Sequence, residues 1–322
     1  MPSEPERKTV IYRTVRGVDI ALDYILPPSS DERSQDGKDD KLPVVVWFHG
    51  GGLIQGSRKS LYPHLLNAAA RHHVCFISAD YRLAPQTRFP GILSDLTCLF
   101  SYLLSPAFAK ATDDRLDLSR IVTIGNSAGG YLSLIAGLGV AFDESGTKRE
   151  TQLVGRIKGV VSIYGITSVT DSFWHEKQRP VSYADRVLTE DEMREHLDPE
   201  ADEISCNDSN SDRNKMYTYM IQEAILQNLL LDGTDLDPEL FTVARAVREE
   251  RTVKPVPPVY LVHGTADDKV PHHQSVQVFE ALRDKGHEVE YEEREGCDHS
   301  FDADEGEPMD KMWAWIVDKL KK

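Results

Sequence analysis

The chain has 322 residues, of which 40 % are hydrophobic, enough for the buried core of one sheet-based domain. Its 53 Asp and Glu residues outnumber 37 Lys and Arg residues, and the formal net charge of −16 argues against binding to nucleic acid or to anionic membrane surfaces. Met1–Lys8 is polar and charged, so we expect neither secretion nor membrane insertion from it, and hence a cytoplasmic protein.

The first predicted elements are two short strands within Thr9–Leu26. Pro27–Lys41 follows as a polar, charged stretch without core-forming residues, and we expect a mobile loop there. Pro43–Phe48 is nearly all apolar, which is typical of a strand buried on both faces of a parallel sheet.

This strand ends in His49-Gly50-Gly51-Gly52. Three consecutive glycines cost conformational entropy and add nothing to a core. A flexible turn is one interpretation. The other is that the backbone N–H groups of Gly51 and Gly52 point inward, where they would stabilise a developing oxyanion. We expect His49 to be structural and to hold the glycine loop by hydrogen bonding.

Helices and strands then alternate. The pattern predicts a helix near Leu61–Arg71, a strand at Val74–Asp80, a helix from Pro90 to Leu104 and, further on, a strand at Ile157–Tyr164. This rhythm indicates a mostly parallel central sheet with helices on both faces and an active site beyond the carboxyl ends of the strands.

The segment Ile121–Tyr131 carries the pattern G-x-S-x-G around Ser127. A β-branched run stops at Gly125, and a run compatible with a helix begins at Ala128. Such a sharp strand-to-helix turn holds its serine in strained, exposed geometry. Ser127 is therefore the candidate nucleophile, although the five-residue pattern alone also fits a turn without chemistry. The N–H of Ala128 would complete an oxyanion hole with Gly51 and Gly52.

The alternation breaks between Gly165 and Lys254, which is too long for a connecting loop. We expect an insertion, residues 165–254, that forms a helical lid over Ser127, supplies an apolar acyl pocket and excludes water. A helical insertion packed away from the site is the alternative. In either case the candidate helices of residues 165–254 are Tyr217–Leu231 and Pro238–Arg248.

The acid and the base should follow the serine along the chain, in that order. A strand at Pro257–His263 leads into Asp267 and Asp268. Asp267 is the preferred acid because it lies closer to the strand, whereas Asp268 is next to Lys269 and should be solvated. His299 is the preferred base, in a loop after the predicted strand Val289–Arg294 and before a helix around Met309–Leu320.

The other histidines fit less well. His72 and His73 end a helix, His272 and His273 open one, His263 ends a strand, and His64, His175, His196 and His287 have polar or helical surroundings. No set of residues has convincing spacing for zinc, so we expect no metal. Cys75 and Cys98 lie in apolar runs as reduced core thiols, which fits a cytosolic compartment.

These motifs resemble the hormone-sensitive-lipase-like branch of the α/β-hydrolases, a group of carboxylesterases and related acyl hydrolases. The similar pieces lie in the right order over residues 43–301: His49–Gly52, Asp80–Pro85, Gly125–Gly130, Asp267 with Val270-Pro271, and Asp298–Phe301. Asn126 departs from the pattern, because many members carry Asp before the nucleophile. The N-terminal strands are a second departure, since relatives often have a helical N-terminal cap.

We therefore expect a single α/β-hydrolase domain over residues 1–322 that hydrolyses a carboxylic ester or related acyl compound. Ser127 would attack the carbonyl, His299 would act as base and Asp267 would orient it, without a cofactor. The partner is a small-molecule acyl substrate. Alternatives are cleavage of a thioester, lactone or amide, transfer of the acyl group to an alcohol, a non-catalytic small-molecule receptor, and a structural role.

Overall fold

The structure is a computed structural model that describes residues 6–28, 41–148 and 150–321. Most of the predicted mobile loop Pro27–Lys41 lies outside the described residues. Within them, one eight-stranded sheet has the order β1-β2-β4-β3-β5-β6-β7-β8. The strands are β1 (Arg7–Val15), β2 (Val18–Ile25), β3 (Leu42–Phe48), β4 (Cys75–Ala79), β5 (Leu116–Asn126), β6 (Ile157–Ile163), β7 (Val259–Gly264) and β8 (Val289–Arg294).

The sheet is mostly parallel. β1 and β2 form an antiparallel hairpin, and β2 pairs antiparallel with β4. Every other neighbouring pair, from β4 and β3 across to β7 and β8, is parallel. The carboxyl ends of these parallel strands therefore meet at one edge of the sheet, where ligands bind in open α/β sheets.

The α-helices are α1 (Pro63–Leu66), α2 (Ala68–His72), α3 (Phe89–Leu103), α4 (Pro106–Ala111), α5 (Ala128–Leu138), α6 (Glu190–Leu197), α7 (Met216–Glu223), α8 (Leu226–Leu231), α9 (Val243–Arg248), α10 (His273–Asp284) and α11 (Asp310–Leu320). Five short 3₁₀ helices are also described: η1 (Thr151–Leu153), η2 (Ser172–His175), η3 (Asp212–Lys215), η4 (Pro238–Phe241) and η5 (Phe301–Ala303).

The predicted strands all form, and three predicted helices are divided. The predicted helix Pro238–Arg248 consists of η4 and α9, with Thr242 between them at φ −85° and ψ 109°. Asn67 lies between α1 and α2 with φ −97° and ψ 0°, outside helical geometry, so Leu61–Arg71 is not one helix. Ala224 has a left-handed backbone, with φ 57°, and separates α7 from α8. Apolar periodicity predicted where these helices lie, but it carries no information about a single residue that leaves helical geometry.

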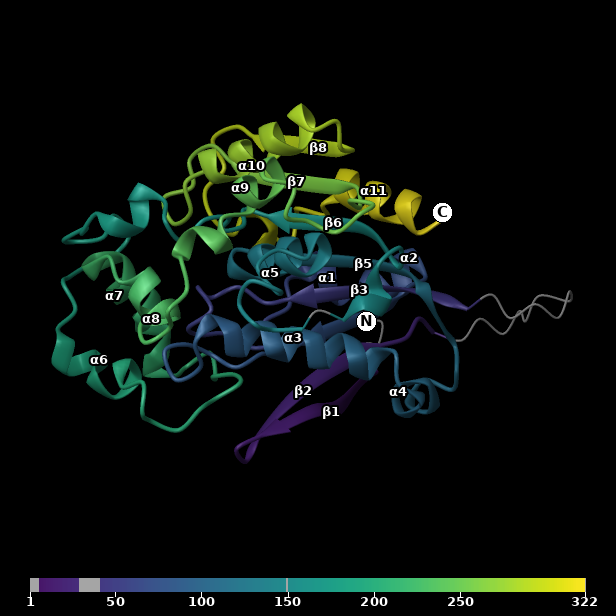
Figure 1. Cartoon of the computed structure of the whole chain (residues 1–322), viewed down its shortest axis with the longest axis horizontal. Helices are drawn as coiled ribbons and strands as arrows, with labels where there is room; N and C mark the ends of the chain where they lie inside the picture. Colours follow the sequence, from purple (N-terminus) through teal and green to yellow (C-terminus); the bar gives the residue numbers. More distant parts are fainter. Residues whose placement is uncertain (1–5, 29–40, 149, 322) are drawn as a thin grey trace, which may run out of the picture.

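Alternation along the strands divides the core between the two faces of the sheet. In β3, Val44, Val46 and Phe48 pack in a cluster with α3, α5, α9 and α10, whereas Val45 and Trp47 pack in a second cluster with α2 and α11. Because successive strand side chains point to opposite faces, an apolar run such as β3 can fill both clusters. This confirms the expected α/β architecture with helices on both faces (Figure 1).

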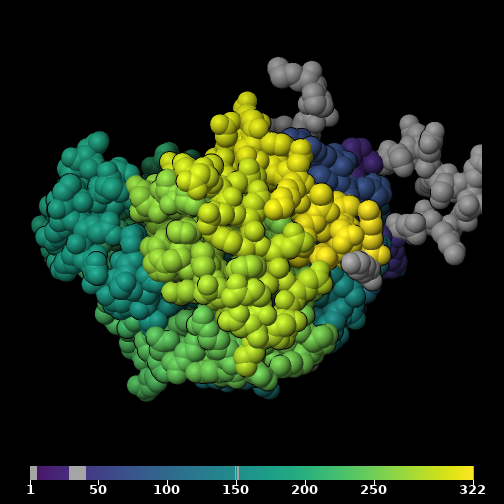
Figure 2. Space-filling model, turned by 90° about the horizontal axis from the view of Figure 1, so that it is seen from above, coloured from purple at the N-terminus to yellow at the C-terminus, as the bar shows by residue number. Residues whose placement is uncertain are grey.

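Residues 165–254 contain several short helices in two locations. Figure 1 shows α6, α7 and α8 together at one end of the molecule. Seen from above in Figure 2, the teal residues of this segment project at the same side. By contrast, α9 lies against α10, and the N–H of Val253 donates to the carbonyl of Leu138 at the end of α5. The end of the segment therefore packs with the core helices.

Candidate active site

Ser127 lies in the turn between β5 and α5, with φ 56° and ψ −124°. A positive φ is strained for a residue with a Cβ atom and is found at functional sites. A Cβ atom on Gly125 would lie 2.2 Å from the carbonyl carbon of Gly129. A Cβ atom on Gly129 would lie 1.9 Å from the carbonyl oxygen of Phe48. Only glycine fits at both positions, which explains the G-x-S-x-G spacing. Ser127 is 4 % exposed, less than its motif predicts.

His299 and Asp267 are in contact. The Nδ1 atom of His299 lies 2.7 Å from Oδ2 of Asp267, and the Asp267 side chain is fully buried. The other carboxylate oxygen, Oδ1, accepts hydrogen bonds of 2.9 Å from the backbone N–H groups of Lys269 and Val270. These bonds fix the carboxylate relative to the turn after β7, so the imidazole of His299 is held through Nδ1 and Nε2 remains free to take a proton.

Burial alone would raise the pKa of Asp267. Hydrogen bonds from His263 and His299 outweigh burial and hold the pKa below its usual range. Asp267 therefore carries a negative charge at neutral pH, which the orienting role expected for it requires. Asp268 behaves differently, because its side chain is 40 % exposed and pairs with Lys269 at 2.8 Å and with the hydroxyl of Ser182 at 2.7 Å.

Sequence reasoning missed the contact between His263 and Asp267. His263 ends β7 as expected, but its Nε2 lies 3.2 Å from Asp267 Oδ2 and 2.9 Å from the Val270 carbonyl oxygen, and its Nδ1 lies 2.7 Å from the Ser275 hydroxyl. Burial lowers the pKa of His263. The available signal in the sequence was that His263 lies four residues before the candidate acid Asp267.

The glycine loop adopts conformations that favour glycine, with φ 104° at Gly51 and 66° at Gly52. The backbone N–H groups of Gly51 and Gly52 donate to no acceptor among the described residues. The N–H of Ala128 begins α5, where backbone donors lack intrahelical acceptors. Within the described residues these three N–H groups thus have no protein acceptor, and of the three residues Gly51 lines the cavity beside Ser127.

His49 is buried and contacts the same loop, as expected. Its Nδ1 lies 2.8 Å from the Gly50 carbonyl oxygen, and its ring stacks on Tyr81 with centroids 4.2 Å apart. The hydroxyl of Tyr81 donates to the His49 carbonyl at 2.7 Å. Burial lowers the pKa of His49 to about 4, so this imidazole is neutral at neutral pH.

A cavity of about 400 Å³ lies between the glycine loop, the Ser127 turn and His299. It contains Ser127, His299 and Gly51 in its lining, whereas the side chain of Asp267 lies behind His299, and Gly52 and Ala128 are not among the described lining residues. The full lining is His49, Gly50, Gly51, Gln55, Gly56, Ser60, Tyr62, Asn126, Ser127, Ser209, Asn214, Tyr217, Thr218, Lys269, His299 and Ser300. None of these lining residues is Leu, Ile, Val, Met, Phe or Trp, and that the 165–254 segment supplies an apolar acyl pocket stays a prediction.

Tyr217 of α7 is the aromatic residue that the 165–254 segment contributes to the cavity. A Cβ atom on Gly52 would lie 2.9 Å from the Tyr217 ring, and the Tyr217 hydroxyl donates to the Lys269 carbonyl at 3.0 Å. It therefore connects the glycine loop with the turn that carries Asp267.

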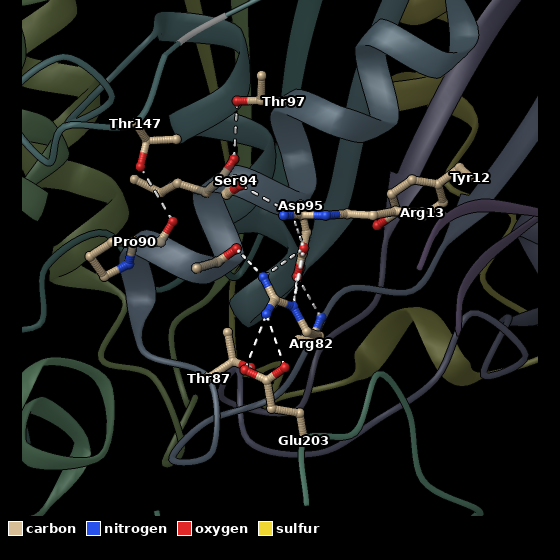
Figure 3. Close-up of polar contacts among 12 residues, drawn as sticks. Tyr12, Arg13, Arg82, Thr87, Pro90, Ser94, Asp95, Thr97, Thr147 and Glu203 are labelled. Atoms are coloured by element: carbon tan, nitrogen blue, oxygen red, sulfur yellow. Dashed lines mark hydrogen bonds and ion pairs between the residues drawn. The ribbon is translucent and has the colours of Figure 1, made fainter. Parts of the chain in front are cut away.

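Polar contacts anchor this segment to the core beside the glycine loop. Arg82 binds Asp95 of α3 at 3.0 Å and Glu203 at 3.1 Å, and the Thr87 hydroxyl also donates to Glu203 (Figure 3). Further along, the N–H of Gly56 donates to Asn207 Oδ1 at 2.7 Å. The Arg82 guanidinium thus holds the acidic run Asp198–Glu203 of the segment against the first turns of α3.

His299 also packs on a buried polar network. Tyr164 follows β6, and the centroids of its ring and of the His299 ring are 4.4 Å apart. The hydroxyl of Tyr164 donates to Asp302. Asp302 also lies 3.1 Å from Nε2 of His64, whose Nδ1 accepts from the Trp313 N–H at 3.1 Å. His64 lies in α1, in the helical surroundings expected, and is buried because η5 and α11 cover it.

The described residues include neither a candidate metal cluster nor a helix that could span a membrane. No cluster of three or more His, Cys, Asp or Glu residues there could hold a metal ion. Likewise, none of the helices in the described part of the chain is long and apolar enough to cross a membrane.

Comparison with known proteins identifies the family. A family model described as an alpha/beta hydrolase fold matches residues 45–303, so the chain belongs to this family of α/β-hydrolases. A solved alpha/beta hydrolase superfamily protein from Enterococcus faecalis has a TM-score of 0.67 and 20 % identity, covering 98 % of each chain. This similarity confirms the fold.

Curated relatives include esterase LipC of Mycobacterium tuberculosis, which is 28 % identical over 278 residues, or 85 % of this chain. The non-reducing polyketide synthase ausA of Aspergillus calidoustus is 25 % identical over 340 residues, or 94 % of this chain. The chain spans only 57 % of the length of the esterase and 13 % of the length of the synthase.

Proposed function

We propose that this protein is a serine hydrolase that cleaves a carboxylic ester through an acyl-enzyme on Ser127. The observation that carries the proposal is the cavity that Ser127 and His299 both line, with the Nδ1 atom of His299 held 2.7 Å from Asp267. The similarity to an esterase of the same family supports it.

In the proposed mechanism, Nε2 of His299 accepts the proton of the Ser127 hydroxyl as its oxygen attacks the ester carbonyl. The N–H groups of Gly51, Gly52 and Ala128 stabilise the oxyanion of the tetrahedral intermediate, each contributing on the order of 3 kcal/mol. His299 then protonates the leaving alcohol. In the second half, His299 deprotonates a water molecule that attacks the acyl-enzyme and releases the acid.

The test is the Ser127→Ala variant. We expect it to lose turnover of p-nitrophenyl acetate while retaining the wild-type circular dichroism spectrum and melting temperature, because Ala fits the same backbone. A fluorophosphonate probe should label wild-type Ser127 and leave the variant unlabelled. Full activity in the variant would contradict the proposal, and so would an unlabelled wild-type protein, as expected for a receptor.

The similarity to a segment of a polyketide synthase favours, as a second candidate, transfer of the acyl group instead of its hydrolysis. The same acyl-enzyme can react with an alcohol in place of water. Assays of ester, thioester and lactone substrates with and without an acceptor alcohol distinguish the two. A new ester that forms faster than free acid would favour transfer.

A further inference from the structure

The lining of the cavity around Ser127 has an unusual composition for a site that would hold a hydrocarbon chain. Among its described residues there is no Leu, Ile, Val, Met, Phe or Trp, and its aromatic residues are Tyr62 and Tyr217. Small-molecule sites are usually lined mainly by apolar side chains, because their burial drives binding. A long acyl chain in this cavity would find no large aliphatic side chain to pack against among these lining residues.

Besides Ser127, hydroxyl groups reach the cavity from three separate parts of the chain. Ser60 and Tyr62 follow the glycine loop, Ser209 and Thr218 come from the 165–254 segment, and Ser300 follows His299. The side chains of Ser60 and Ser209 are exposed and make no described hydrogen bond to another described residue. They are therefore free to donate to and accept from a hydroxylated ligand.

The cavity also lacks an unpaired charge. Lys269 is the cationic residue among the described lining residues other than histidine, and no Asp or Glu is among them. Its Nζ lies 2.8 Å from Asp268 and 4.3 Å from the centroid of the Tyr183 ring. Because Asp268 offsets its charge, Lys269 gives no preference for a carboxylate or phosphate.

We propose that the substrate is a small, neutral, hydroxylated ester, namely a short-chain acyl ester of a polyol or sugar-sized alcohol. This inference rests on the proposed function. The volume of about 400 Å³ is towards the lower end for small-molecule sites, which fits an alcohol of this size with a short acyl group. Each substrate hydroxyl that finds a partner should raise kcat/KM about threefold to tenfold.

The first test compares substrates on the full chain. For acyl length, kcat/KM for p-nitrophenyl acetate should exceed that for p-nitrophenyl octanoate at least about tenfold. For the alcohol, release of acetate in a pH-stat should be at least about tenfold more efficient from glycerol monoacetate than from propyl acetate, which lacks only the two hydroxyls. A preference for octanoate, or equal rates for the two acetates, would overturn the inference.

A second test changes the lining. The double variant Ser60→Leu with Ser209→Leu should raise the octanoate-to-acetate ratio of kcat/KM at least about tenfold, because it adds apolar surface at the cavity. Ser101→Leu, at an exposed position on α3, is the matched control and should leave the ratio unchanged. A ratio that does not respond to the double variant would overturn the inference.

Labelling of Ser127 by a fluorophosphonate separates this inference from the proposed function. A labelled protein that prefers long acyl chains would overturn the substrate class and leave the serine hydrolase standing. An unlabelled protein would overturn the proposed function, and the substrate class would fall with it.

Discussion

The carboxylate of Asp267 has four hydrogen-bond partners: two backbone N–H groups and two histidine side chains. Two backbone N–H groups hold Oδ1, while His263 and His299 both approach Oδ2. His263 is buried behind the site and His299 lines the cavity. The buried imidazole can therefore fix the carboxylate while the other remains available to a substrate.

We predict that Asp267→Asn lowers kcat for p-nitrophenyl acetate by on the order of 10⁴, because an amide no longer stabilises the correct tautomer of His299. Asp268→Asn is the matched control at the next position. It should lower kcat less than about tenfold, since Asp268 contacts Ser182 and Lys269 instead of His299. A larger loss in the Asp268 variant would assign the acid to that residue.

His49 gives a prediction about pH. Its pKa is about 4 in the folded protein against an ordinary value of 6.5. Between these values the unfolded chain binds a proton and the folded protein does not, so stability falls as the pH falls through this range, by up to about 3 kcal/mol at pH 4. Well above pH 6.5 neither the folded nor the unfolded state binds this proton, so His49 adds no pH dependence to the stability.

The measurement is urea unfolding of the wild type and of His49→Asn at pH 7, 6, 5 and 4. The variant lacks the titrating imidazole, so the difference in free energy of unfolding between wild type and variant should decrease steadily as the pH falls. Parallel curves for the two proteins over the whole range would contradict the assignment.

At the scale of elements, the 165–254 segment is tied to the core next to the glycine loop. Glu203 is reached by Arg82 and Thr87, the N–H of Leu83 donates to the Ile204 carbonyl at 2.9 Å, and Asn207 contacts Gly56 in both directions. The loop that carries Gly51 is therefore braced by a distant part of the sequence. That the whole segment acts as a lid stays a prediction.

Glu203→Gln should loosen this attachment. The Arg82 guanidinium would lose its charged partner on the segment but keep Asp95, so we expect a loss of about 1–3 kcal/mol, confined to the segment. Hydrogen exchange should become faster at the N–H of Leu83 and of Asn207, whose acceptors join the two parts. Glu200→Gln, at an exposed residue of the same acidic run, is the control. Equal exchange in both variants would contradict the prediction.

At the scale of the whole molecule, α11 covers one face of the sheet and reaches the network behind His299. The Trp313 side chain is fully buried, stacks on His72 at 4.5 Å and donates to His64, which in turn contacts Asp302. One residue near the end of the chain thus links the core of that face to the support of the candidate base.

Trp313→Ala should destabilise the protein by about 3–5 kcal/mol, because it leaves a cavity and removes the donor to the buried His64. Lys311→Ala, with a side chain 59 % exposed on the same helix, is the control and should change the free energy of unfolding by less than about 0.5 kcal/mol. Denaturant unfolding measures both. A loss under 1 kcal/mol in the tryptophan variant would contradict this account of the core.

Local steric requirements made much of the fold readable from the sequence alone. Apolar runs such as Pro43–Phe48 predict strands because both faces of the sheet are covered, and the glycines around Ser127 predict the turn because no Cβ atom fits beside it. The packing requirement leaves its mark in a short stretch of sequence even where the contacting residue is distant, as Phe48 is from Gly129. The family resemblance and the mostly parallel sheet were therefore both predicted and are confirmed.

Only the tertiary structure decided what surrounds the serine. The sequence predicted that Asp267 would orient His299, but the contact of His263 with the same carboxylate and that of Tyr217 with Gly52 were seen only in the structure. The same holds for the polar lining, because the aromatic residues of the 165–254 segment gave no indication of which side chains would face the cavity. Such contacts depend on how distant elements pack, and a pattern of neighbouring residues does not contain that information.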